Sequence, residues 1–183
     1  MATPTAFLAE LSHHRWSIPI LAQLSGQDGG RVTALAHAVG ASRGGVRQAV
    51  SALTRLDLLR PNPGHGHPLR PEFVLTPLGR ELSDPARALV RRLDCWSIQS
   101  EVFRKWPLPV VYGLGEVGAR FGEVRERLPT ITDRALSLAL HRLEATGLVD
   151  RMIVEARPPS VRYRPTDRGV EIRLLLGPLA SPV

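Results

Sequence analysis

The stretch Arg15-Trp16-Ser17-Ile18-Pro19 returns 90 residues later as Lys105-Trp106-Pro107-Leu108-Pro109. Further pairs at the same spacing are Ser42 and Thr132, Leu53 and Leu143, and Leu58 and Leu148. A 90-residue period is too long for a solenoid unit and matches the length of a small domain. The chain is therefore predicted to hold two copies of one small domain, arranged as an intramolecular pseudo-dimer.

The composition favours a folded protein with a polyanionic partner. The chain has 183 residues, of which 43% are hydrophobic, and a net charge of +7. Residues 1–92 hold 11 arginines and 6 acidic residues, for a net charge of +5, whereas residues 93–183 hold 13 basic and 11 acidic residues, for +2. The net charge suggests a polyanionic partner, for which double-stranded DNA is the candidate. The use of arginine in place of lysine has an alternative explanation in a GC-rich genome, which does not explain the net charge.

Several classes of protein are disfavoured by what the sequence lacks. There is no apolar run of membrane-spanning length and no secretory signal pattern, so a cytoplasmic, nucleoid-associated protein without membrane contact is expected. The single cysteine, Cys95, excludes an internal disulfide and a multi-cysteine zinc site, and no metal or cofactor is expected. No phosphate-binding glycine loop or nucleophile–base pair indicates an enzyme.

The first half is predicted to form a helix-turn-helix. Residues 5–23 have a helical pattern, in which Pro19 marks either a break or the first turn of a second helical piece. A short helix follows over 32–39, and Ser42 is the N-cap candidate of the next helix, 43–56. The buried stripe predicted for that helix comprises Val46, Ala49, Val50, Leu53 and Leu56. Two short helices joined by a tight turn make residues 42–56 the recognition helix.

A β-hairpin wing is predicted after this recognition helix. Residues 58–60 and 72–75 have strand character and flank a loop rich in proline and glycine. Thr76 then begins another helix, with Pro77 at its first position.

The second half is predicted to repeat this order. Its elements are a helix over 106–114, a short helix over 121–128, a recognition helix over 132–146 capped by Thr132, and strands over 148–154 and 161–163. A long helix over 84–103 is predicted to join the halves. The expected fold is mainly α with small β wings (α+β), divided into domains 1–83 and 104–183 with the linking helix 84–103.

The outward side chains of the recognition helices and wings are the candidate DNA-binding residues. Arginine pairs with phosphate or guanine, and glutamine pairs with adenine. The candidates are Ser42, Arg43, Arg47, Gln48, Arg70, Thr132, Arg134, Ser137, His141, Arg157 and Arg162. Asp133 and Glu144 partly neutralise the second recognition helix, so the two halves are expected to bind non-identical half-sites. Gly44 and Gly45 either permit close approach of the backbone to DNA or reflect flexibility alone.

The second half resembles the HxlR-type winged helix-turn-helix regulators. The landmarks of the resemblance are Arg104-Lys105-Trp106, residues 120–124, 128–132 and 143–149, and the wing Arg157-Pro158-Pro159-Ser160-Val161-Arg162-Tyr163. The first half matches more loosely, at Arg15-Trp16, 53–59 and 75–80.

The resemblance implies a bacterial or archaeal transcription regulator. Family members usually carry one such domain and dimerise through terminal helices. This chain joins two copies and ends soon after Ile172–Leu176, which leaves little of a C-terminal dimerisation helix for further self-association.

The resemblance also gives Cys95 two interpretations. Some HxlR-type regulators sense oxidants through a cysteine that precedes the Lys-Trp helix, and Cys95 precedes Trp106 by eleven residues. Alternatively, Cys95 is a buried thiol beside Leu93 and Trp96 that acts as a small hydrophobe. Trp16 and Trp106 are expected to pack in the core and not to line a ligand pocket.

Two functions compete at this level. The first is a sequence-specific transcription regulator that binds double-stranded DNA through residues 42–56 and 132–146 and the wings. The alternative is a winged-helix adaptor for protein interaction, with weak DNA binding or none.

Overall fold

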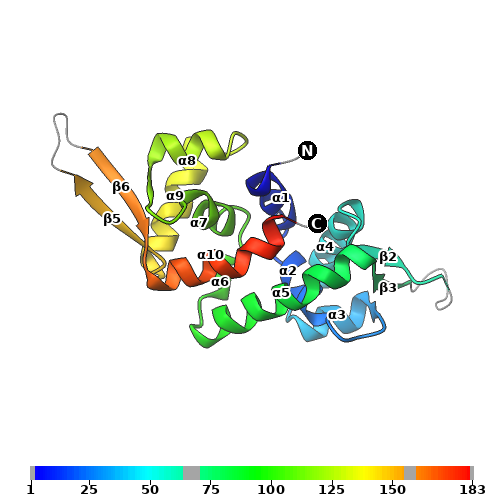
Figure 1. Ribbon diagram of the computed structural model, residues 1–183. Helices are drawn as coiled ribbons and strands as arrows, with labels where there is room; N and C mark the ends of the chain where they lie inside the picture. The colour runs from blue at the N-terminus through cyan, green and yellow to red at the C-terminus, as the bar shows by residue number, and fades with distance from the viewer. Residues whose placement is uncertain (1–2, 64–70, 155–159, 182–183) are drawn as a thin grey trace.

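The computed structural model describes residues 3–63, 71–154 and 160–181 of the chain (Figure 1). Its architecture is mainly helical with two small sheets, as predicted. The elements of the first part are α1 (Pro4–Leu11), α2 (Ser17–Gln23), β1 (Gly30–Arg31), α3 (Val32–Ala38), α4 (Arg43–Arg55), β2 (Leu59–Pro61), β3 (Glu72–Leu75) and α5 (Pro77–Cys95).

The same order of elements recurs in the second part of the chain. Its elements are α6 (Gln99–Val102), α7 (Pro107–Leu114), β4 (Ala119–Arg120), α8 (Phe121–Arg127), α9 (Asp133–Ala145), β5 (Val149–Val154), β6 (Ser160–Pro165) and α10 (Asp167–Ala180). In Figure 1 the strand pairs β2–β3 and β5–β6 project from opposite ends of the molecule, while α5 and α10 cross its middle.

Each part contains a three-stranded antiparallel sheet in which the last strand lies at the centre. The strand orders are β1-β3-β2 and β4-β6-β5. Gly30 pairs with Phe73 in the first sheet, and Ala119, 89 residues after Gly30, pairs with Tyr163 in the second. The two-residue strands β1 and β4 were not predicted, because two residues are too short to show the alternating pattern of a strand.

The predicted recognition helices are confirmed as helices α4 and α9. Ser42 Oγ accepts a hydrogen bond from the Gly45 N–H at 3.1 Å, and Thr132 Oγ1 accepts one from the Ala135 N–H at 3.3 Å. These side chains cap the first turns, where backbone N–H groups have no partner within the helix. The buried residues of the two helices are Val46, Ala49, Val50, Ala52, Leu53, Leu136, Ala139, Leu140 and Leu143.

Two glycines allow a helix to approach the wing closely. A Cβ atom added at Gly79 in α5 would lie 2.0 Å from the carbonyl oxygen of Leu58, and one added at Gly169 in α10 would lie 2.0 Å from that of Leu148. The same two carbonyls accept hydrogen bonds from the N–H groups of the preceding N-cap residues, Thr76 and Thr166. Each close approach therefore holds the start of the long helix against the wing.

The two parts share one continuous hydrophobic core. Helix α5 packs on α2 and on α10, and α1 packs on α7. Across the contact between α5 and α10, Arg92 forms an ion pair with Glu171, and Arg92 and Arg168 both lie over the ring of Trp96. The relative orientation of the two parts is therefore set by packing, as expected for a linker that is not flexible.

Two predicted helices have different bounds in the structure. The helix predicted over 84–103 is wrong in its limits: α5 begins at Pro77, contains Pro85 and ends at Cys95, and Ser97 with φ of 55° separates it from α6. The helix predicted over 5–23 is divided into α1 and α2 by a turn before Ser17. Pro19 lies in the first turn of α2, which is the second of the two predicted alternatives.

Candidate nucleic-acid interface

Helix α4 presents one buried face and one polar face. The predicted residues Ser42, Arg43, Arg47 and Gln48 are all exposed. None of the side chains of Arg43, Arg47 and Gln48 forms a hydrogen bond or ion pair within the part of the chain that the structure describes. Their charged and amide groups are free to meet a partner.

A groove of about 880 Å³ lies between α4, the start of α3 and the first wing. Its charged residues are Arg31, Arg43, Arg47 and Arg55. Among the described residues no acidic side chain lines it, so four arginines share one concave surface without a neutralising carboxylate. Such a surface favours a polyanion, and guanidinium groups bind phosphate oxygens in bidentate geometry.

Arg31 was not among the predicted contact residues. Strand β1 places it in the groove, because the pairing of Arg31 with Glu72 holds β1 beside the wing. A two-residue strand leaves no periodic signal in a sequence, so this position could be found only from the fold. Arg55, at the end of α4, completes the groove.

His14 adds no charge near this groove at neutral pH. Burial lowers the pKa of His14 below its ordinary value, and the nearby His13 and Arg55 lower it further. The lowered pKa favours the neutral imidazole at pH 7, so the arginines are the main source of positive charge on this side.

The two glycines at the start of α4 have different surroundings. A Cβ atom at Gly44 would meet only Ser42 Oγ, at 4.0 Å. One at Gly45 would lie 3.2 Å from both Cδ1 and Nε1 of Trp16. Gly45 thus makes room for the indole of Trp16, a reason within the fold that neither predicted interpretation of this glycine had included.

These surroundings predict opposite responses to alanine. Gly44→Ala is expected to raise the free energy of unfolding by up to ~1 kcal/mol, since alanine is the better helix former. Gly45→Ala is expected to be at least ~1 kcal/mol less stable than Gly44→Ala, because the added methyl group crowds Trp16. Urea denaturation followed by circular dichroism measures both. Equal stability of the two variants would show that Trp16 moves aside freely.

Helix α9 presents a different surface. Thr132, Arg134, Ser137 and His141 are exposed, as predicted. The residue 90 positions after Gln48 is Leu138, whose side chain is 47% exposed. An apolar side chain thus occupies the position that holds an amide in α4.

Ion pairs neutralise much of the charge around α9. Asp133 pairs with Arg125 at 2.9 Å, and Arg142 pairs with Glu101 at 3.4 Å. Within the described residues, Arg134 is the arginine of α9 that has no such partner. The contrast with α4 matches the predicted difference in charge between the two halves.

The wing candidates are only partly placed. Arg70 and Arg157 lie outside the described residues. Arg162 is half-buried, and its guanidinium donates a hydrogen bond to the Gly118 carbonyl oxygen at 3.2 Å. Arg162 therefore helps to hold β4 against β6, and its contact with DNA stays a prediction. Arg151 and Arg164, on the same hairpin, are exposed.

Trp16 and Trp106 are both partly buried and pack against the core, as predicted. Arg15 lies over the first ring at 4.6 Å and Lys105 over the second at 4.8 Å. Trp16 also lines a surface cavity, which the sequence had not indicated.

Cys95 is exposed at the end of α5, so the expectation of a buried thiol is wrong. Cys95 lies on a different face of α5 from Leu93, which is fully buried. Its role as an oxidant sensor stays a prediction.

Within residues 3–63, 71–154 and 160–181, no cluster of three histidine, cysteine or acidic side chains is arranged to hold a metal ion. Over the same residues, no helix combines the length and apolar character needed to cross a membrane.

Comparison with known proteins identifies the family of this chain. The model of the HxlR-like helix-turn-helix family matches residues 101–181. The HTH-type transcriptional regulator YkvN of Bacillus subtilis, itself uncharacterised, is 36% identical over 94 residues, which make up 50% of this chain and 80% of that protein. The chain belongs to the HxlR-like helix-turn-helix family. This is a family of transcriptional regulators and not of enzymes.

Other similar proteins match over different shares of their own length. An uncharacterised HTH-type transcriptional regulator of Methanothermobacter thermautotrophicus is 35% identical over 82 residues, and the chain spans less than two thirds of it, 63%. Among solved structures, the redox regulator HypR in its oxidised form is 31% identical, with 49% of this chain and 86% of that chain covered and a TM-score of 0.41.

Proposed function

We propose that this HxlR-like chain is a sequence-specific transcription regulator that binds double-stranded DNA. In this proposal, residues 1–83 and 104–183 are two winged helix-turn-helix domains joined by residues 84–103. They form an intramolecular pseudo-dimer whose recognition helices, 42–56 and 132–146, contact two neighbouring half-sites.

The recurring order of elements supports the tandem arrangement. The sheets have the same strand order, and the close approaches at Gly79 and Gly169 lie 90 residues apart and involve equivalent carbonyl oxygens. Helix α5, which starts in the first unit and continues into the joining segment, packs on α10 of the second unit as the terminal helices of a dimer pack on each other.

The arginine groove beside α4 carries the proposal of DNA binding. Arg31, Arg43, Arg47 and Arg55 line it, and no acidic side chain in the described part of the chain does. The groove lies between the polar face of a recognition helix and a wing, where a winged helix-turn-helix meets the duplex. Gln48 and Ser42 lie beside these arginines on the same exposed surface, where they are suited to contact bases.

The two halves are expected to contribute unequally. The α4 surface offers several unpaired guanidinium groups, whereas α9 offers Arg134, Thr132, Ser137 and His141. Phosphate contacts set the salt dependence of binding, so the first half dominates it. The operator is then asymmetric, with two different half-sites.

A mobility-shift titration at several salt concentrations tests the DNA proposal. The probe is duplex DNA selected from a random pool, and selected sequences are expected to hold two different half-sites about 34–36 Å apart, one helical turn. Log affinity is expected to fall linearly with log salt, with a slope of about −3.6 from the four groove arginines alone.

A failure to enrich any sequence, together with affinity that does not change with salt, would contradict the proposal. That outcome would favour the alternative, a protein-interaction adaptor. The exposed Leu138 on α9 and the exposed Ile153 on the second wing are the observations that favour an adaptor. Selected sites with two identical half-sites would contradict the proposed asymmetry alone.

A further inference from the structure

A surface cavity of about 560 Å³ lies between α2, α3, α5 and α6, away from the arginine groove. This volume falls within the range of small-molecule sites. Trp16, Phe103 and Val90 provide apolar walls, and Arg87, Arg91 and Asp94 provide charged groups along α5. Large aromatic walls with a few polar groups are typical of sites that bind organic ligands.

In the second half, α1 lies against the position that corresponds to one of the cavity-lining residues. Thr5 Oγ1 in α1 donates a hydrogen bond to the Arg127 carbonyl oxygen at 2.8 Å, and Thr5 Cγ2 lies 4.0 Å from the Cβ position of Gly113. The residue 90 positions before Gly113 is Gln23, which lines the open cavity.

The length of one helix explains why the cavity is open in the first half. Helix α6 precedes the Lys-Trp pair as α1 precedes the Arg-Trp pair, but α6 has 4 residues and α1 has 8. The residues between Cys95 and Gln99 form the turn that ends α5, so α6 starts late and is short. We infer that α6 is too short to cover the first half as α1 covers the second half. The cavity is therefore a product of the asymmetry between the halves.

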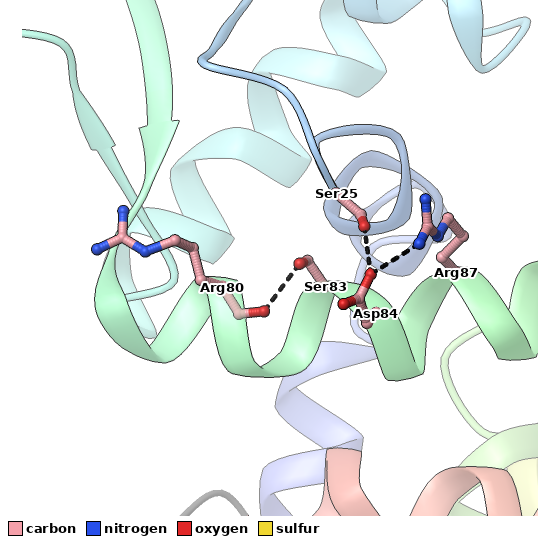
Figure 2. Close-up of polar contacts among 5 residues, drawn as sticks. All are labelled: Ser25, Arg80, Ser83, Asp84 and Arg87. Carbon is pink, nitrogen blue, oxygen red and sulfur yellow. Dashed lines mark hydrogen bonds and ion pairs between the residues drawn. The ribbon is translucent and has the colours of Figure 1, made fainter.

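The charged side chains that line the cavity are Arg87, Arg91 and Asp94, and they differ in whether they already have a protein partner. Asp84 accepts a hydrogen bond from Ser25 at 2.6 Å and another from Arg87 at 3.0 Å (Figure 2). The guanidinium group of Arg87 therefore already has a partner within the protein. Asp94 accepts one from Gln99. Arg91 has neither a hydrogen bond nor an ion pair from its side chain among the described residues. A guanidinium group without a partner beside aromatic walls matches a carboxylate attached to a flat ring.

We propose that this cavity binds a small planar aromatic carboxylate as an effector. The ring packs against Trp16 and Phe103, and the carboxylate pairs with Arg91. Trp16 connects the cavity to α4, because its indole also lies against Gly45 in the first turn of that helix. A ligand that displaces the indole therefore shifts the start of the recognition helix. The effect on DNA, but not the binding itself, rests on the proposed function.

The binding is tested without DNA, with 2-naphthoate as the probe. The chain has 3 tryptophans, and their indole N–H signals can be followed by NMR in the full-length protein. Saturable binding of one molecule per chain is expected, with a shift of the Trp16 signal and none of the Trp106 signal. The neutral 2-naphthamide is expected to bind at least about tenfold more weakly.

Matched arginine variants assign the carboxylate contact. Arg91→Gln is expected to weaken 2-naphthoate binding about tenfold, whereas Arg151→Gln, which removes the same charge from the exposed second wing, leaves it unchanged. The proposal is overturned if 2-naphthoate shows no saturable shift, if Arg91→Gln binds it as well as the parent chain, or if Trp106 responds in place of Trp16.

The effect on DNA is measured separately by mobility shift with and without saturating 2-naphthoate. A change of at least about fivefold in DNA affinity is expected. Unchanged affinity with intact 2-naphthoate binding would overturn the effector role. An absence of DNA binding without 2-naphthoate would instead contradict the proposed function, and the NMR result would stand independently.

Discussion

The double variant Arg43→Ala, Arg47→Ala is expected to bind its selected DNA site about 100-fold more weakly than the parent chain at 0.15 M salt. Both guanidinium groups belong to residues that line the groove beside α4, and neither has a hydrogen-bond or ion-pair partner among the residues that the structure describes. Each hydrogen bond that involves a charged group contributes about 1.5–3 kcal/mol, so two lost contacts give at least this effect. The slope of log affinity against log salt is expected to become shallower by about 1.8.

Two single variants act as controls for this result in the same mobility-shift assay. Arg91→Ala removes a similar charge from α5, outside the groove, and is expected to change affinity less than about twofold in the absence of effector. Arg134→Ala on α9 is expected to reduce affinity less than the α4 double variant. If Arg134→Ala proved the more damaging, the assignment of the main electrostatic contact to the first half would be wrong.

Gly79→Ala and Gly169→Ala are each expected to destabilise the protein by ~3 kcal/mol. A methyl group at Gly79 would overlap the carbonyl oxygen of Leu58, and one at Gly169 would overlap that of Leu148. A side chain could adopt another rotamer to relieve the overlap, but a backbone carbonyl group cannot. For a chain of this length the loss corresponds to a fall in Tm of roughly 6–12 °C. Thermal unfolding followed by circular dichroism measures it.

Gly122→Ala is the matched control, because a Cβ atom there would meet nothing within 4 Å. Its Tm is expected to equal or exceed that of the parent chain, since alanine is favoured in a helix. A parental Tm for Gly79→Ala or Gly169→Ala would show that the helix can separate from the wing without loss of packing. A strong effect at only one of the two would show that the halves differ in stability as well as in charge.

The features predicted correctly from the sequence depend on neighbouring residues along the chain. The caps Ser42 and Thr132 each precede a helix whose apolar residues recur at helical spacing, and both helices were placed to within one residue at their ends. The first wing was found in the same way, because a turn-rich loop separates two short strand patterns. The difference in charge between α4 and α9 was also predicted correctly. It depends only on the acidic residues in the sequence of α9 and on their absence from the sequence of α4.

The features that were missed depend on contacts between distant residues. The start of α5 at Pro77 was predicted, but its continuation to Cys95 was not, because Pro85 looked like a helix boundary and in fact lies inside the helix. The inclusion of Arg31 in the groove depends on strand pairing, and the role of Gly45 depends on a tryptophan 29 residues away. The cavity follows from a difference in length between α1 and α6, which has no signature in either segment alone.

The continuous core has a consequence for how this protein responds to its own abundance. A regulator assembled from separate subunits falls apart as it is diluted, so its occupancy of an operator drops more steeply than its copy number. Here α5 and α10 are held together by one covalent chain and one core. In the proposed single-chain pseudo-dimer, operator occupancy well below saturation is expected to rise in direct proportion to copy number, and even a few molecules per cell remain fully assembled.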